Sequence, residues 1–223
     1  MAMKFKSVFD IIGPAMIGPS SSHTAGAARI GRMARLLFGR PPARAEFILY
    51  GSFAGTYKGH GTDVALAGGV QLFDTFDPRI KDALILAKDT DLDIVITAEE
   101  DPEEHPNTAR VILEDDQGSL EIKGISIGGG KIEIKEAGGF EVNLTGDSWT
   151  LLVFHEDHFG MIASVAQVLA DHQINIGRMQ MSRKGKGQEA LLMIETDQPM
   201  DDLIGQQVAQ FPHVAGARII PPL

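Results

Sequence analysis

The last third of the chain has an order of predicted elements that few folds can accommodate. Between residues 149 and 220 a strand and a helix are followed by two strands, a second helix and a final strand. The first of these helices, residues 161–172, has Ile162, Val165 and Leu169 at the three- and four-residue spacing of an amphipathic helix. A βαββαβ order favours one antiparallel sheet with both helices on the same face. No cofactor motif occurs within it.

Composition limits the classes of partner and of chemistry. The chain has 223 residues, of which 43% are hydrophobic and 22% are charged, which is ordinary for one large or two modest globular domains. A net charge of −10 argues against nucleic acid and anionic membrane surfaces as partners. No segment is apolar enough for a membrane span or a signal peptide, so we expect a cytoplasmic protein. The absence of cysteine removes disulfides, thiolate nucleophiles and thiolate-held metals or clusters from this chain.

Three serines, a histidine and a threonine stand in a row before a predicted helix. Residues 20–24 read Ser-Ser-Ser-His-Thr, directly after the Gly18-Pro19 turn. Downstream, Ile30, Met33 and Leu37 recur at helical spacing up to about Gly39. Serine and threonine cap helix N-termini, and a helix N-terminus attracts anions. The stretch therefore suggests a carboxylate or phosphate site, and the alternative is a serine-rich cap with an incidental histidine.

A second polar stretch follows the predicted strand 44–50. It contains His60-Gly61-Thr62-Asp63, interpreted as a turn ahead of a small-residue helix at residues 64–69. A carboxylate beside an imidazole can fix its tautomer and raise its basicity. With a similar stretch nearby we favour a functional histidine here, and the alternative is a turn that happens to contain one.

The remainder of the first region alternates helices and strands. We expect helices at residues 7–12 and 77–89, strands at 92–97, 107–113, 119–127 and 131–135, and a solvated acidic loop at 98–106. Gly128-Gly129-Gly130 predicts a tight bend, with a phosphate-binding nest as the alternative. Residues 138–147 read as a connecting region and contain the expected domain boundary. Five arginines, Arg29, Arg32, Arg35, Arg40 and Arg44, fall in a stretch without acids, which suits a small anionic ligand or an exposed helix face.

The region from residue 149 onward resembles an ACT domain, a ferredoxin-like βαββαβ module that senses amino acids. The resemblance rests on the first strand, Asp157-His158-Phe159-Gly160, the helix and Ile174-Asn175-Ile176. It implies an effector site at Asp157, His158, Gly160 and Asn175, and self-association through this domain. The usual proline before the glycine is Phe159, and Asp157 stands where an amide is common. A structural or dimerising role is the alternative.

A second resemblance covers nearly the whole chain. Five segments together resemble the beta subunit of bacterial iron–sulfur L-serine dehydratases. These are residues 7–10, 18–24, 50–52, 59–63 and 128–130. The resemblance implies an α+β chain: an α/β sandwich at residues 1–145, like the domain inserted in some phosphoglycerate dehydrogenases, and an ACT domain at 148–223.

The same resemblance implies chemistry and partners. L-serine would be deaminated to pyruvate and ammonia, in amino-acid catabolism and gluconeogenesis, by a heterodimer with an alpha subunit whose cysteines hold a [4Fe–4S] cluster. His60 is the first choice for the base that removes the α-proton, and His23 would hold the carboxylate or support the base. The remaining implied substrate-site residues are Ser20, Ser21, Ser22, Thr24, Ser52, Thr62 and Asp63, of which Thr62 and Asp63 would also position His60.

Two other functions remain open at this point. One is a non-catalytic regulatory module that binds an amino acid or hydroxy acid. The other is a phosphate-ester binder that uses residues 20–24 and 128–130. Neither needs a cysteine-bearing partner, whereas the dehydratase does.

Overall fold

The computed structural model describes residues 14–100 and 104–223. The predicted helix at residues 7–12, and residues 101–103 of the acidic loop, lie outside this part. Contacts between residues divide the chain into two compact units, with the division after Gly138. Among the described residues no helix is both long and apolar enough to cross a membrane.

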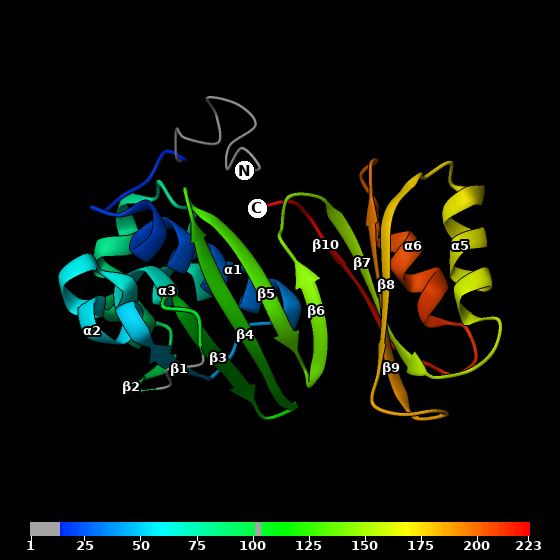
Figure 1. Cartoon of the computed structure of the whole chain (residues 1–223), viewed down its shortest axis with the longest axis horizontal. Coiled ribbons are helices and arrows are strands. Elements are labelled where there is room, and N and C mark those ends of the chain that lie inside the picture. Colours follow the sequence, from blue (N-terminus) through cyan, green and yellow to red (C-terminus); the bar gives the residue numbers. More distant parts are fainter. Residues whose placement is uncertain (1–13, 101–103) are drawn as a thin grey trace, which may run out of the picture. The chain divides into compact units, whose positions relative to one another are not determined.

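The first unit is built on a sheet with helices on one side (Figure 1). The six-stranded sheet has the order β2-β1-β3-β4-β5-β6, in which β1 and β2 are parallel while β1–β3, β3–β4 and β4–β5 are antiparallel. Its strands are β1 (Arg44–Tyr50), β2 (Asp93–Glu99), β3 (Thr108–Asp115), β4 (Gly118–Gly128) and β5 (Lys131–Ala137), and the last strand in the order is β6 (Phe140–Leu144), which follows the division at Gly138. The helices are η2 (Ser21–Ala25), α1 (Gly26–Phe38), α2 (Gly51–His60), α3 (Thr62–Val70), η3 (Pro78–Asp82) and α4 (Ala83–Asp89).

Helix α1 is the central element of this unit. It packs on β3, β4 and β5 with one face and against α3 with another. Ile30, Met33 and Leu37, the residues whose spacing predicts the helix, are all buried. The helix ends at Gly39, whose backbone N–H donates to the Arg35 carbonyl, as the sequence predicts.

Two glycines allow the backbones of α1 and α3 to approach each other closely. A Cβ added at Gly69 would lie 2.0 Å from the Ala28 carbonyl oxygen, and one at Gly31 would lie 2.3 Å from the Leu66 carbonyl oxygen. Both obstacles are helix backbone, which cannot rotate aside as a side chain can. The contact between the two helices therefore requires glycine, which has no Cβ, at both positions.

The second unit confirms the predicted βαββαβ order. Its sheet has the order β10-β7-β9-β8, and all neighbouring strands are antiparallel. Figure 1 shows α5 and α6 side by side on one face of that sheet, where Val165, Leu169 and Val208 join a buried core with Leu151 and Ile194. The elements are β7 (Trp149–Glu156), α5 (Met161–Asp171), β8 (Ile176–Arg183), β9 (Glu189–Thr196), α6 (Asp202–Ala209) and β10 (Val214–Ile220).

The structure extends or corrects the sequence interpretation in three places. Residues 51–60, for which the sequence predicted no helix, form α2 although Gly51, Gly55 and Gly59 weaken helix propensity, because tertiary packing of fully buried Phe53 outweighs that weakness. The helix predicted at residues 77–89 is a 3₁₀ turn, η3, followed by α4. The region interpreted as a connection contains β6, where Phe140, Val142 and Leu144 alternate as buried positions. The proposed domain bounds, 1–145 and 148–223, stay a prediction.

The close contact between α1 and α3 makes a stability prediction. Gly69→Ala should lower the free energy of unfolding by about 1–3 kcal/mol or more, because the new methyl group forces two helix backbones apart. Gly55→Ala on α2 is the matched control, since a Cβ there meets nothing within 4 Å and alanine favours a helix by about 1 kcal/mol. Urea unfolding of both variants is the measurement. Equal stability of Gly69→Ala and wild type would contradict the packing described.

Candidate active site

Residues 20–25 form a π-helical turn that leads into α1. Ser20 is the N-cap, its hydroxyl accepts from the His23 backbone N–H at 3.1 Å, and its carbonyl accepts from the N–H groups of Thr24 and Ala25. A π turn widens the helix by one residue and is often found at functional sites. The predicted serine cap is therefore present, and one of its three serines does the capping.

Serine hydroxyls surround the imidazole of His23. The Ser22 hydroxyl lies 3.0 Å and the Ser20 hydroxyl 3.4 Å from Nδ1, while Ser52 of α2 lies 2.9 Å from Nε2. A hydroxyl can donate to one ring nitrogen or accept from the other, so this arrangement suits a neutral imidazole of either tautomer. The two predicted stretches thus meet at the ring of His23.

The surroundings of His23 disfavour its charged form. Burial of the imidazole, followed by repulsion from His60, lowers the pKa of His23 below its usual value. The rings of His23 and His60 lie 4.8 Å apart between centroids and are tilted by 41°. Two imidazoles this close cannot both be protonated without mutual repulsion, so we expect at most one charge on the pair.

His60 is held differently from His23. It is the last residue of α2, and Gly61 follows in the left-handed conformation with φ +67° before α3 begins. Its Nδ1 atom is buried and has no hydrogen-bond partner among the described residues. His60 as a whole is half-buried. Its ring therefore has a nitrogen whose hydrogen-bonding capacity is not used by the described residues.

Four of the predicted site residues make contacts within this region, and their roles toward a ligand stay a prediction. The Thr24 side chain is buried and its hydroxyl donates to the His60 carbonyl at 2.9 Å, so it anchors the backbone of His60. Thr62 is also buried, with no partner for its hydroxyl among the described residues. Asp63, in the first turn of α3, accepts from the Val64 N–H at 2.8 Å, and the Ser21 carbonyl accepts from the Gly26 N–H. Within the described part of the chain, none of these side chains is hydrogen-bonded to the His60 Nδ1 atom.

Phe53 is a site residue that the sequence analysis missed. Its ring packs edge-on against the His23 imidazole at 5.3 Å between centroids, and its N–H donates to the Pro106 carbonyl. Phe53 is fully buried and supplies an apolar wall behind His23. An aromatic residue among glycines is a weak signal, because its partner is 30 residues away in the chain.

The predicted positive surface is largely neutralised. Arg32 pairs with Asp74, Arg40 with Asp115, and Arg44 with three acids. Arg29 donates to the Gly130 carbonyl at 3.0 Å, which joins α1 to the β4–β5 turn. Gly128–130 is indeed a tight bend, with positive φ at all three positions. Arg35, alone among these five arginines, has no partner among the described residues.

The predicted effector residues of the second unit make contacts within that unit. The Asp157 carboxylate accepts from the Gly187 N–H and from Arg183, and these bonds lower the pKa of Asp157. The Asn175 side-chain amide donates to Asp197 at 2.6 Å. The His158 ring stacks on His213 at 4.3 Å between centroids, and Gly160 is the N-cap of α5. Effector binding at these residues stays a prediction.

Comparison with known proteins supports both predicted domains. The model of the serine dehydratase beta chain family matches residues 7–87, which include both histidines, and the ACT domain model matches residues 149–213. The chain is 26% identical over 142 residues to D-3-phosphoglycerate dehydrogenase of Methanocaldococcus jannaschii. That match covers 64% of this chain and 27% of the dehydrogenase.

Two relatives match almost from end to end. The chain is 58% identical over 212 residues to the probable L-serine dehydratase beta chain of Bacillus subtilis, which covers 95% of this chain and 96% of the relative. It is 36% identical over 198 residues to the L-serine dehydratase beta chain of Peptoniphilus asaccharolyticus, with 88% and 89% covered. With both domains in this order and matches of this extent, the chain belongs to the family of L-serine dehydratase beta chains.

Proposed function

We propose that this chain is the beta subunit of a cytoplasmic L-serine dehydratase, which converts L-serine to pyruvate and ammonia together with an alpha subunit. The observation that carries the proposal is the pair of adjacent imidazoles, one surrounded by serine hydroxyls and the other with an unpartnered ring nitrogen. The names of the relatives supply the substrate and the reaction.

The hydroxyl-lined side of the pair suits the substrate carboxylate. Ser20 and Ser22 lie at the start of the helical segment that becomes α1, where free N–H groups and the helix dipole favour an anion. Ser52 approaches from α2 and closes the other side of the His23 ring. In this arrangement His23 and the three hydroxyls hold the carboxylate, and His23 is neutral because burial disfavours its charge.

His60 is the better placed base for the α-proton. Loss of water from serine requires removal of the proton on Cα as the β-hydroxyl departs, and a neutral imidazole can accept that proton. The hydrogen bond from Thr24 to the His60 carbonyl anchors the backbone at the end of α2, which leaves the ring held by packing against His23. His23, by contrast, has partners at both ring nitrogens.

The iron–sulfur cluster of this enzyme class does not fit the residues of this chain. The sequence has no cysteine, and the described residues contain no cluster of three or more potential metal ligands. Thiolates hold such clusters in proteins. We therefore place a [4Fe–4S] cluster in the alpha subunit and assign to this chain the carboxylate site and the base.

The two-subunit proposal predicts dependence on a partner. The purified chain alone should be colourless and form no pyruvate from L-serine, whereas co-expression with the alpha subunit from the same source should give anaerobic activity and a stable complex. The measurements are pyruvate formation and co-purification. Activity of the chain alone, or failure of the two chains to associate, would refute the assignment.

The roles of the two histidines predict different kinetic defects in the assembled enzyme. His60→Ala should lower kcat by about 10²–10⁴-fold, the usual contribution of a general base. His23→Ala should raise KM more than it lowers kcat, because it removes ground-state binding of the carboxylate. His172→Ala, at an exposed histidine of the second unit, is the control and should leave both constants unchanged. A His60→Ala enzyme within a few-fold of wild-type kcat would exclude His60 as the base.

The neutral state of His23 can be measured directly. In an NMR pH titration of the chain, His23 should titrate below the ordinary histidine value of about 6.5. His60→Ala should raise the pKa of His23, since it removes the repulsion from His60 and admits water. In the wild-type chain the folded state binds the His23 proton less readily than the unfolded state, so His23 should destabilise the fold as the pH falls below about 6.5. An unchanged His23 titration in His60→Ala would show that the rings are not coupled.

A further inference from the structure

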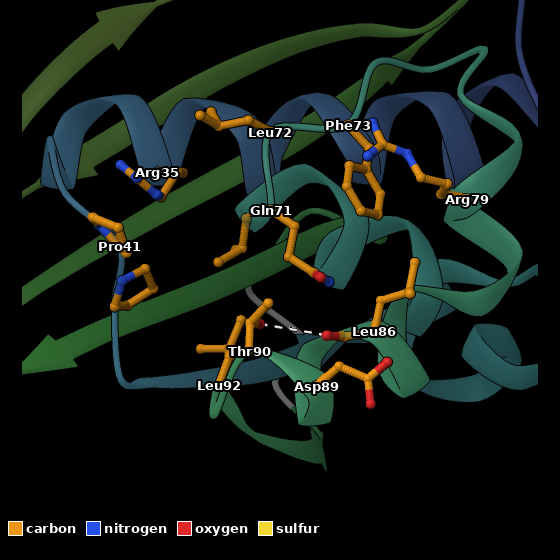
Figure 2. A pocket seen from close by; sticks show the side chains of 12 residues that line it. Arg35, Pro41, Gln71, Leu72, Phe73, Arg79, Leu86, Asp89, Thr90 and Leu92 are labelled. Carbon is orange, nitrogen blue, oxygen red and sulfur yellow. Dashed lines mark hydrogen bonds between the residues drawn. The ribbon is translucent and has the colours of Figure 1, made fainter.

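The first unit has a cavity separate from the histidine pair. It has a volume of about 400 Å³, within the range of small-molecule sites, and is lined by residues from the end of α1, the following Pro41-Pro42 segment, the end of α3, and α4 (Figure 2). None of the predicted active-site residues lines it. Arg35 lies twelve residues beyond His23, roughly 18 Å along a helix that rises about 1.5 Å per residue.

Most of the wall is apolar and firmly held. Leu72, Phe73, Leu86 and Leu92 contribute to it (Figure 2). The Gln71 side-chain amide donates to the carbonyls of Ala67 and Ala83, at 3.0 and 2.9 Å, and so ties the end of α3 to the start of α4. The Thr90 hydroxyl donates to the Ala87 carbonyl. These polar groups therefore brace the wall by bonding to the backbone.

Of the two arginines that line the cavity, one has no ion pair among the described residues. Arg79, at the opposite end from Arg35 in Figure 2, is paired with Asp77 and lies over the Phe73 ring. Arg35 is partly buried and has no hydrogen-bond or ion-pair partner among the described residues, although Asp89 also lines the cavity. Burial lowers the pKa of Arg35, which is the sign of a guanidinium that has lost water without gaining an acid.

Leu72 provides an independent indication that this wall serves a purpose. Its φ is +65°, in the left-handed region that is unfavourable for a bulky residue, and its N–H donates to the Gly69 carbonyl. Glycine would relieve the strain at this helix end. Instead the leucine side chain is 43% exposed and faces the cavity. Strain of this kind tends to persist where a side chain has a functional contact.

We propose that this cavity binds a small organic acid, with its carboxylate on Arg35 and its apolar body against Leu72, Phe73 and Leu86. A guanidinium pairs with a carboxylate through two parallel hydrogen bonds. Arg79 is neutralised by Asp77, and Asp89 lines the cavity without an ion pair among the described residues. Arg35 is therefore the cation available to a carboxylate, and the nearby Asp89 carboxylate makes a monoanion a better match than a phosphate dianion. The site is distinct from the proposed catalytic one and does not depend on it.

The test uses the full chain without the alpha subunit, and isocaproate as the probe. Amide NMR spectra should show saturable shifts at Gln71, Leu72 and Phe73. Acetate, which lacks the apolar body, and isocaproamide, which lacks the charge, should each bind at least about tenfold more weakly. These comparisons need no variant, so they hold even if a substitution disturbs the fold.

Substitutions then locate the two halves of the site. Arg35→Gln should weaken isocaproate binding at least tenfold, and Leu72→Ala should weaken it several-fold. Lys88→Gln, an equal charge change at an exposed α4 position outside the cavity, should have no effect. The proposal is overturned if isocaproate causes no saturable shift at these amides, if isocaproamide binds as tightly, or if folded Arg35→Gln binds within twofold of wild type.

Discussion

The contact between α1 and α3 is the constraint on which the candidate active site depends. Gly31 and Gly69 bring two helix backbones so close that neither position tolerates a Cβ. The segment leading into α1 contains His23, and the residue before the turn into α3 is His60. Fixing the two helices against each other therefore fixes the two imidazoles at 4.8 Å. If the two helices packed less closely, His23 and His60 would stay in the same elements but their imidazoles would no longer be adjacent.

The two histidines have the same side chain, but their surroundings give them different hydrogen bonding and different proposed roles. His23 sits against Phe53 with hydroxyls at both nitrogens, which determine its position, and burial lowers its pKa, which favours the neutral form. His60 has its backbone anchored by Thr24 and its Nδ1 buried without a partner. A buried polar atom without a partner is costly, and such a cost in a native structure points to a group that is completed by a ligand or another chain.

The arginines of α1 and of the segment after it also differ in their surroundings, because only some of them have partners. Pairing with acids distant in sequence removes Arg32, Arg40 and Arg44 from consideration as an anion site. Arg29 serves the β4–β5 turn. Arg35 is left without a partner among the described residues, at the end of α1 opposite to the histidines, beside a braced apolar wall. One helix thus carries the candidate catalytic site at its start and the proposed organic-acid site at its end.

The sequence by itself determined the βαββαβ order of the second unit, the amphipathic α1 and the two polar stretches, because periodicity and capping are local properties. It also indicated the family, through short motifs, and the family model and the relatives bear that indication out. Tertiary structure alone decided that residues 51–60 form a helix against their glycine content, and that Phe53 backs His23. It likewise decided that Thr24 and Thr62 turn inward, and which arginines are neutralised. Each of these outcomes depends on a partner far away in the chain, and no local pattern records which partner that is.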